Sequence, residues 1–203
     1  MRKLILIFCG VFCCLTALHA KDPVLYLYQV DALDKVFKDR RYFVDEIDTL
    51  AVARGEYATL QVVIKSNREV KEMRAYVESV AGEAGKIEGA QTGWVGYVRA
   101  GRKYQPTSKD LLRTPSDYFP DPILTDVEMD MEVNDVQPVW VTVPIARNTE
   151  PGLYKGKLVI EGQVDRKKQS WSKEFYVRVF PVTIGETSLP VSYTHLTLPT
   201  ILR

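Results

Sequence analysis

Four acidic side chains near the middle of the chain have a spacing that suits acid–base chemistry. They alternate strictly with apolar residues over 126–133, and they are Asp126, Glu128, Asp130 and Glu132. In an extended strand, alternate residues share one face and lie about 6.6 to 6.8 Å apart. This spacing matches the about 6.5 to 9.5 Å between the two carboxyl groups of inverting glycosidases. Two alternatives stay open: a solvated strand face answered by Lys or Arg across the sheet, or a calcium site using two of these oxygens.

A second set of candidate site residues is aromatic and belongs to a proline-containing connection, residues 101–125. Connections longer than about 12 to 15 residues are usually functional or disordered. Flat ring faces with amides and acids nearby are what a sugar ring stacks on. We therefore predict substrate-binding roles for Tyr104, Tyr118 and Phe119. The alternative is that Tyr118 and Phe119 pack the connection onto a sheet.

Three further aromatic residues favour structural roles. Trp94 and Tyr97 lie in a strand-like run, so packing in the core is favoured over sugar contact. Trp140 stands beside three valines, which predicts a core or inter-domain residue.

The distribution of His and Cys excludes several kinds of chemistry. The chain has 2 His and 3 Cys. His19 and all the cysteines lie within residues 1–20, and the other histidine is His195. Residues 21–190 therefore offer no Ser-His or Cys-His pair, no imidazole or thiolate zinc site and no disulfide. We predict no metal and no cofactor.

The balance of charge gives no sign of a polyanionic partner. Of the 27 Lys and Arg residues, three (Arg2, Lys3 and Arg203) lie at the two ends, which leaves 24 against 26 Asp and Glu. The resulting formal charge of −2 lacks the electrostatic footprint of nucleic-acid or membrane binding. We therefore predict neither partner.

The two ends of the chain differ in character from its body. Residues 1–20 have a basic start, an apolar stretch and a small residue at Ala20, which predicts a cleavable signal peptide. The remaining protein is thus expected to be exported, periplasmic or extracellular, with no membrane attachment after cleavage. Val191 to Thr200 match one translated frame of a transposon adapter used in sequencing libraries. We predict that 191–203 is adapter-derived and that the natural reading frame was cut near Leu189.

Between these ends, short strand-like runs separated by turn residues predict an all-β fold. Residues 47–53 and 57–65 predict a hairpin around Arg54-Gly55, with one strand face formed by Ala58, Leu60, Val62 and Ile64. Residues 137–160 predict a second hairpin that turns at Pro151-Gly152, and its first strand has one face formed by Val139, Val141 and Val143. The remaining predicted strands are 24–30, 70–80, where helical spacing also fits, 94–100 and 171–180, the last paired with the strand from Leu153. Strands at this spacing predict a two-sheet antiparallel β-sandwich, immunoglobulin- or fibronectin-like, over 21–184, with 185–190 starting a linker.

Several of these segments resemble the N-terminal domain of glycoside hydrolase family 123 and related hydrolases of unknown function. The resemblance spans about residues 24–184, with Gly55 departing from an expected Asn. The residues that carry it are Tyr28 to Val36, Arg54 to Val62, Pro120 to Ile123, Trp140, Pro151, Gly152, Tyr154 and Gly156. It implies a β-sandwich that precedes a (β/α)₈ barrel, in which an adjacent Asp-Glu pair hydrolyses β-N-acetylgalactosaminides with the substrate's acetamido group as nucleophile. No residue of this chain inherits those catalytic roles.

The hypothesis that follows is a non-catalytic N-terminal sandwich of an exported glycoside hydrolase, cut off before its barrel. Its expected partners are its own C-terminal catalytic barrel and a glycan substrate. The alternatives are a free carbohydrate-binding or surface-attachment module, and a stand-alone enzyme that uses the acidic strand. The resemblance also leaves open a parent that hydrolyses another sugar or a substrate that is not a sugar.

Overall fold

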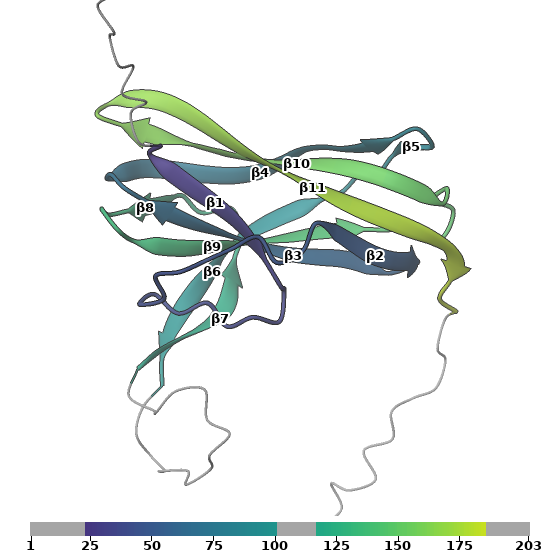
Figure 1. Cartoon of the computed structure of the whole chain (residues 1–203), viewed down its shortest axis with the longest axis horizontal. Coiled ribbons are helices and arrows are strands. Elements are labelled where there is room, and N and C mark those ends of the chain that lie inside the picture. The colour runs from purple at the N-terminus through teal and green to yellow at the C-terminus, as the bar shows by residue number, and fades with distance from the viewer. Residues whose placement is uncertain (1–22, 101–116, 186–203) are drawn as a thin grey trace, which may run out of the picture.

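The protein folds as two stacked β-sheets, seen in a computed structural model that describes residues 23–100 and 117–185 (Figure 1). The five-stranded sheet has the order β1-β3-β9-β6-β7, and the six-stranded sheet has the order β2-β11-β10-β4-β5 with β8 paired to β4. The strands of the first are β1 (Leu25–Val30), β3 (Tyr57–Ser66), β9 (Val136–Pro144), β6 (Gln91–Arg99) and β7 (Tyr118–Leu124). Those of the second are β2 (Thr49–Arg54), β11 (Lys167–Thr183), β10 (Gly152–Val164), β4 (Val70–Gly82), β5 (Gly85–Lys86) and β8 (Met129–Met131).

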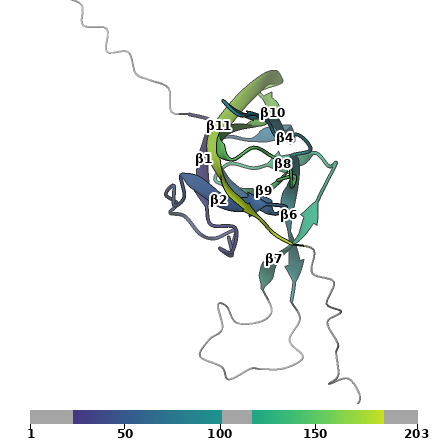
Figure 2. The ribbon, with the colours of Figure 1, turned by 90° about the vertical axis from the view of Figure 1, so that its right-hand side faces the viewer.

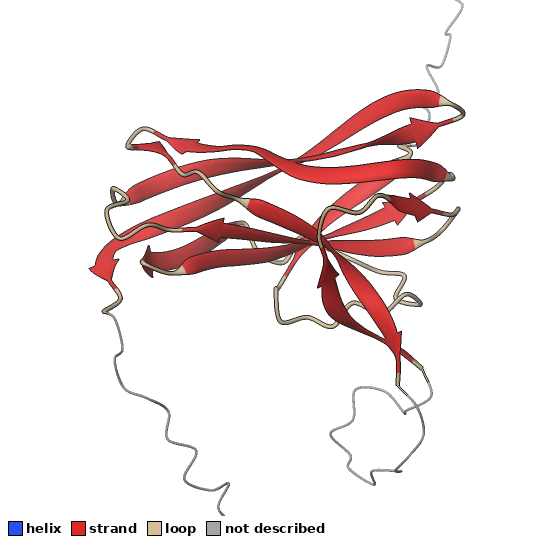
Figure 3. Ribbon diagram, turned by 180° about the vertical axis from the view of Figure 1, so that it is seen from behind, coloured by secondary structure: helices blue, strands red, loops and turns tan. Residues whose placement is uncertain are grey.

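The predicted all-β sandwich is confirmed. Every regular element of the described residues is a strand, as the view from behind shows (Figure 3). After a quarter turn the two sheets lie one above the other, and the β6–β7 end of the five-stranded sheet extends below the rest (Figure 2). All strand pairs are antiparallel except β2 with β11, which is parallel. Within the described ranges no helix is long and apolar enough to span a membrane.

The core lies between the sheets and is built from alternating strand residues. The predicted inward face of β3 is confirmed, since Ala58, Leu60, Val62 and Ile64 are buried. Val139, Val141 and Val143 of β9 are fully buried beside them, and Leu158 and Ile160 face them from β10. Because side chains alternate between the two faces of a strand, each of these strands places one apolar row in the core.

Both predicted hairpins at tight turns are wrong, because the strands concerned belong to different sheets. β2 pairs with β11, whereas β3 pairs with β1 and β9. The N–H of Gly55, at φ 88°, donates to Ile145 O at 2.8 Å, and Ile145 N–H donates to Glu56 O at 2.8 Å. The turn is therefore a corner between sheets. In the same way, β9 and β10, the strands before and after Pro151, belong to opposite sheets.

The predicted pairing of the strand from Leu153 with 171–180 is confirmed. β10 and β11 run antiparallel from Gly152↔Val179 to Val164↔Lys167. Asp165 and Arg166 form the turn, with φ of 51° and 64°. Positive φ at both central residues is typical of the type I′ turn that joins hairpin strands.

A bulge in β4 explains why its sequence also fits a helix. Val70 and Met73 are both fully buried although they are three residues apart. Glu72 between them has φ of 51°, and the register of β4 shifts between Val70 and Met73 where it pairs with β8. A bulge inserts one residue, so inward positions fall three apart instead of two.

Part of the predicted long connection is a strand. Residues 118–124 form β7 and pair with β6 in spite of Pro120 and Pro122. β7 is the edge of its sheet, where proline is tolerated because one row of backbone N–H groups needs no partner. The acidic run 126–133, in contrast, is not one extended strand as expected. Within it only 129–131 form a strand, β8, and Asp126 has φ of 57°. Residues 1–22, 101–116 with Tyr104, and 186–203 lie outside the described residues.

Residues 31–46, here called the covering segment, pack over the outer side of the five-stranded sheet. Val36 and Phe43 form a small second core with Val30, Val63 and Val136. The side-chain amide of Gln61 is buried and lies 2.9 to 3.2 Å from the carbonyl oxygens of Asp31, Ala32 and Asp34. Gln61 thus holds the start of the covering segment on the sheet.

Gly156 of β10 leaves the space that a buried aromatic ring fills. A Cβ built on Gly156 would overlap three atoms of the Phe175 ring, and Phe175 lies opposite Gly156 on β11 and is fully buried. The glycine is therefore required by packing, and β10 runs directly beneath the ring.

Gly156→Ala is expected to destabilise the sandwich by about 3 kcal/mol, the upper end of the cost of overpacking a core. Gly152→Ala is the matched control, because its Cβ would lie 3.6 Å from Ala84, an ordinary contact. Urea unfolding followed by tryptophan fluorescence measures both. Equal stability of the two variants would contradict the packing argument.

Candidate functional site

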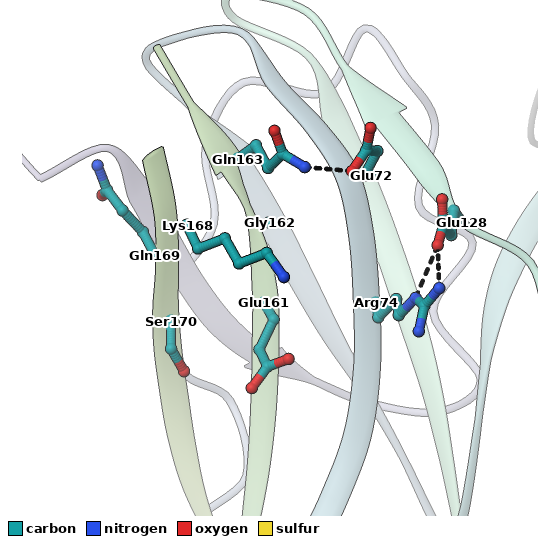
Figure 4. A pocket seen from close by; sticks show the side chains of 9 residues that line it. All are labelled: Glu72, Arg74, Glu128, Glu161, Gly162, Gln163, Lys168, Gln169 and Ser170. Carbon is teal, nitrogen blue, oxygen red and sulfur yellow. Dashed lines mark hydrogen bonds and ion pairs between the residues drawn. The ribbon is translucent and has the colours of Figure 1, made fainter. Parts of the chain in front are cut away.

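The acidic run borders a polar pocket on the outer face of the six-stranded sheet (Figure 4). The pocket has a volume of about 380 Å³. It is lined by Glu72 and Arg74 of β4, Glu128, and Glu161 to Gln163 and Lys168 to Ser170 of β10 and β11. Its walls are the exposed side chains of neighbouring strands.

The carboxylates of this pocket are held by partners on adjacent strands. Arg74 Nε donates to Glu128 Oε1 at 2.7 Å, and this contact raises the pKa of the Arg74 guanidinium. Tyr76 donates its hydroxyl proton to Glu161 Oε1 at 2.9 Å. Gln163 donates to Glu72 (Figure 4). The pairing of Glu128 with an Arg on the neighbouring strand is what the solvated-face alternative predicts.

The other members of the acidic run do not join a common site. Asp130 Oδ1 accepts the backbone N–H of Glu72 at 2.9 Å, so it supports the bulge in β4. Asp126 and Glu128 also border a second hollow, with Trp94 and Thr92. Among the residues described, no three His, Cys, Asp or Glu side chains are grouped so that they could hold a metal ion.

Two of the predicted substrate-binding residues, Tyr118 and Phe119, begin β7 and differ in what their side chains contact. Tyr118 is 55 % exposed at the start of β7, opposite Arg99. Phe119 turns the other way and meets Phe37 of the covering segment edge-on, with ring centroids 5.7 Å apart. Phe119 thus contacts the covering segment, whereas the side chain of Tyr118 is exposed.

Trp94 has the core position predicted for it, whereas Tyr97 lies outside the core and contacts the covering segment. Trp94 is 3 % exposed in the core, and its indole N–H donates to Val127 O at 3.1 Å. Tyr97 donates its hydroxyl proton to Val36 O at 2.9 Å, and Lys38 lies over its ring. Burial, and then the negative charge of Asp135, raise the pKa of Tyr97. Tyr97 is thus a second attachment point for the covering segment.

The sequence analysis missed the residues that hold this segment. Gln61 is one outward residue of a β3 run that otherwise reads as regular alternation. Within 57–66, alternation predicts that a polar residue at position 61 is exposed to solvent, whereas Gln61 is buried. The signal that was present is its place within one of the family-like stretches, Arg54 to Val62.

The fold and these contacts define an all-β sandwich domain in which Gln61, Tyr97 and Gly156 serve packing. The chain belongs to the family of glycoside hydrolase 123 N-terminal domains, since the model of that family matches residues 43–162. The match runs from the covering segment to β10 and includes the Trp140 strand and Gly156.

Solved structures agree on the fold. A family 123 glycoside hydrolase from Clostridium perfringens, studied for glycolipid glycan hydrolysis, superposes with a TM-score of 0.59 at 19 % identity. The alignment covers 79 % of this chain but 28 % of that enzyme, so the chain spans under a third of its length. No curated protein matches.

Two smaller sandwiches are more distant. A PapD-like domain of human CEP192 aligns over 89 % of this chain and 96 % of its own, at 10 % identity and a TM-score of 0.37. The CooA pilin subunit of enterotoxigenic Escherichia coli aligns over 78 % and 100 %, at 12 % identity and a TM-score of 0.38.

Tyr97→Phe is expected to lower the free energy of unfolding at pH 7 by about 1 kcal/mol, because one buried hydrogen bond is lost. An unfolded tyrosine titrates near pH 10, while the folded pKa of Tyr97 is raised. Above about pH 10 the unfolded state loses a proton that the folded state keeps, so the parent loses stability there as pH rises. The variant lacks this loss, so the difference between the two should shrink from pH 9 to pH 11.

Urea unfolding at pH 7, 9 and 11 measures this difference. Tyr118→Phe, which removes an exposed phenol, is the matched control. A gap for Tyr97→Phe that stays constant or widens toward pH 11 would refute the assignment.

Proposed function

We propose that this chain is the non-catalytic N-terminal sandwich of an exported glycoside hydrolase of the β-N-acetylgalactosaminidase type, truncated before its catalytic barrel. The observation that carries the proposal is the unequal coverage of the Clostridium enzyme. The alignment takes in 79 % of this chain and 28 % of that one, so the enzyme has more than twice as much chain elsewhere. A (β/α)₈ barrel of about 250 residues accounts for a large part of such a remainder.

The state of the carboxylates supports a non-catalytic role. A glycosidase holds its two carboxyl groups on either side of the scissile bond. Here Glu128 is paired with Arg74 and Asp130 supports a backbone bulge. Both point out from one sheet face, where a sugar would meet them from the same side.

The proposed location and partner follow from the rest of the chain. The signal-like residues 1–20 support export to the periplasm or beyond. The proposed partner is the catalytic barrel of the same polypeptide, and the proposed substrate of the whole enzyme is a glycan with a terminal N-acetylhexosamine.

One observation favours a second candidate, a free carbohydrate-binding module. Tyr118, the first residue of β7 and opposite Arg99, has an exposed side chain. An exposed tyrosine ring is a common stacking surface, since it offers a flat apolar face with a polar edge.

The first prediction concerns hydrolysis. The gene recovered from genomic DNA is expected to continue past residue 190 into a barrel, and its product should cleave a chromogenic β-N-acetylgalactosaminide. Residues 21–190 alone should show no turnover above buffer, because the carboxylates of the acidic run in the described residues are engaged by Arg74 and by the backbone of Glu72. A stop codon in the genomic gene directly after the sandwich, or hydrolysis by the isolated sandwich, would sink the proposal.

The second prediction separates the two candidates by binding. Titration calorimetry of residues 21–190 with N-acetylgalactosamine is expected to show no saturable heat, and Tyr118→Ala should leave the trace unchanged. Saturable binding that disappears in Tyr118→Ala would instead establish the binding-module candidate. Tyr42→Ala, which removes a ring that is 90 % exposed elsewhere on the surface, is the control.

A further inference from the structure

The two outer faces of the sandwich differ in charge. On the six-stranded sheet, outward side chains of β10 pair with acidic residues of its neighbours: Lys155 with Glu174 and Lys157 with Glu78, each at 2.7 Å. Such interleaved charge is typical of a sheet face that remains in water. These paired charges are therefore suited to solvent, and Leu153 and Tyr76 are exposed among them.

The outward row of the five-stranded sheet is uncharged where the covering segment does not reach it. Across β3, β9 and β6 the register aligns Tyr57 with Pro144, Thr59 with Thr142 and Gln91, and Gln61 with Trp140 and Gly93. We call Tyr57, Trp140, Pro144 and Ile123 the apolar row. Ile123 joins it from β7, because its Cγ2 occupies the place where a Cβ on Gly93 would be.

The members of the apolar row are accessible on the sheet surface, two of them exposed and two half-buried. Tyr57 is 68 % exposed and Ile123 is 43 % exposed, while Trp140 and Pro144 are half-buried. The Trp140 indole N–H already donates to Thr142 Oγ1 at 3.2 Å. Trp140 can therefore be covered by an apolar surface with no unsatisfied donor left behind.

The chain leaves the sandwich beside this row. After β11, Ile184 N–H donates to Arg54 O at 2.9 Å. The Ile184 carbonyl oxygen lies 3.5 Å from where a Cβ on Gly55 would be, and Gly55 precedes Tyr57 by two residues. The end of β11 and the end of β2 meet at the right of Figure 1. A domain that follows directly after Gly185 would thus begin next to Tyr57.

We propose that the apolar row is the docking surface for the catalytic domain that follows in the same polypeptide. This inference rests on the proposed function and adds to it the face that is used. Aromatic residues are enriched and charged residues depleted in the cores of such interfaces. A short connection from Gly185 holds the following domain at high effective concentration over this face. The charged outer face of the six-stranded sheet stays in water.

The absence of Cys from residues 21–190 allows a direct test of burial. Tyr57→Cys places one thiol in the apolar row, and Tyr42→Cys places a control thiol on the covering segment, where Tyr42 is 90 % exposed. Each variant is made in residues 21–190 and in the uninterrupted enzyme. Maleimide labelling is followed by mass spectrometry of the peptide that contains the new cysteine.

The thiol at position 57 is expected to react at the rate of an exposed thiol in residues 21–190. In the uninterrupted enzyme it should react at least about tenfold more slowly, because interface cores are packed as tightly as protein interiors. The thiol at position 42 should react equally in both. Equal reactivity at position 57 in both proteins overturns the inference, while the proposed function stands if the enzyme still hydrolyses its substrate.

Two further results would assign the apolar row to another occupant and so also overturn the inference. One is protection of position 57 in residues 21–190 that rises with protein concentration, which indicates a second copy of the chain. The other is protection in residues 21–190 on addition of N-acetylgalactosamine, which indicates a glycan. A gene with no following domain removes the proposed function and this inference together.

Discussion

The packing of the inward rows of β3 and β9 against those of β4 and β10 is the interaction on which the rest of this structure depends. With no cysteine after residue 20, no disulfide can constrain the sandwich, so stability must come from apolar burial at about 25 cal/mol per Å². The chain crosses between the sheets at the β2–β3 corner and again between β9 and β10. Neither sheet is therefore continuous in sequence. Because the core is formed from both sheets, we expect them to form together, which favours cooperative folding.

Periodicity in the sequence predicts the buried face of a strand but leaves its neighbours undetermined. The rows Leu60-Val62-Ile64 and Val139-Val141-Val143 are predicted correctly because alternation alone decides which side is apolar. The hairpins at Gly55 and Gly152 are wrong because a tight turn looks the same whether the next strand pairs with the last or crosses to the opposite sheet. The deciding contacts, such as Gly55 N–H to Ile145 O, join residues 90 positions apart. At the β10–β11 hairpin, by contrast, the positive φ of Asp165 and Arg166 gives the turn the backbone geometry that joins paired strands.

The candidate site shows the same limit in chemical terms. Alternation placed Glu128 and Asp130 on the surface, but the sequence cannot say that Arg74, 54 residues away, answers one of them. The family-like stretches prove to be packing devices: Gln61 fastens the covering segment, Gly156 admits Phe175, and Ile123 fills the space over Gly93. A resemblance carried by such residues identifies the fold of the domain, because each of them is fixed by what it packs against.

The covering segment offers a physical precedent for the docking face. A sheet face with apolar outward residues needs a cover, and over β1 and β3 the chain supplies one from residues 31–46, held by Gln61 and Tyr97. The covering segment does not extend over the apolar row of the same sheet, where the outward residues are also uncharged. The six-stranded sheet carries ion pairs outward, one of which joins Lys173 of β11 to Asp45 of the covering segment at 2.6 Å. The surface thus has three parts. The outer face of the six-stranded sheet carries ion pairs and is solvated, and part of the five-stranded sheet is covered by residues 31–46. The region around Trp140 is the part that we propose an adjoining domain covers.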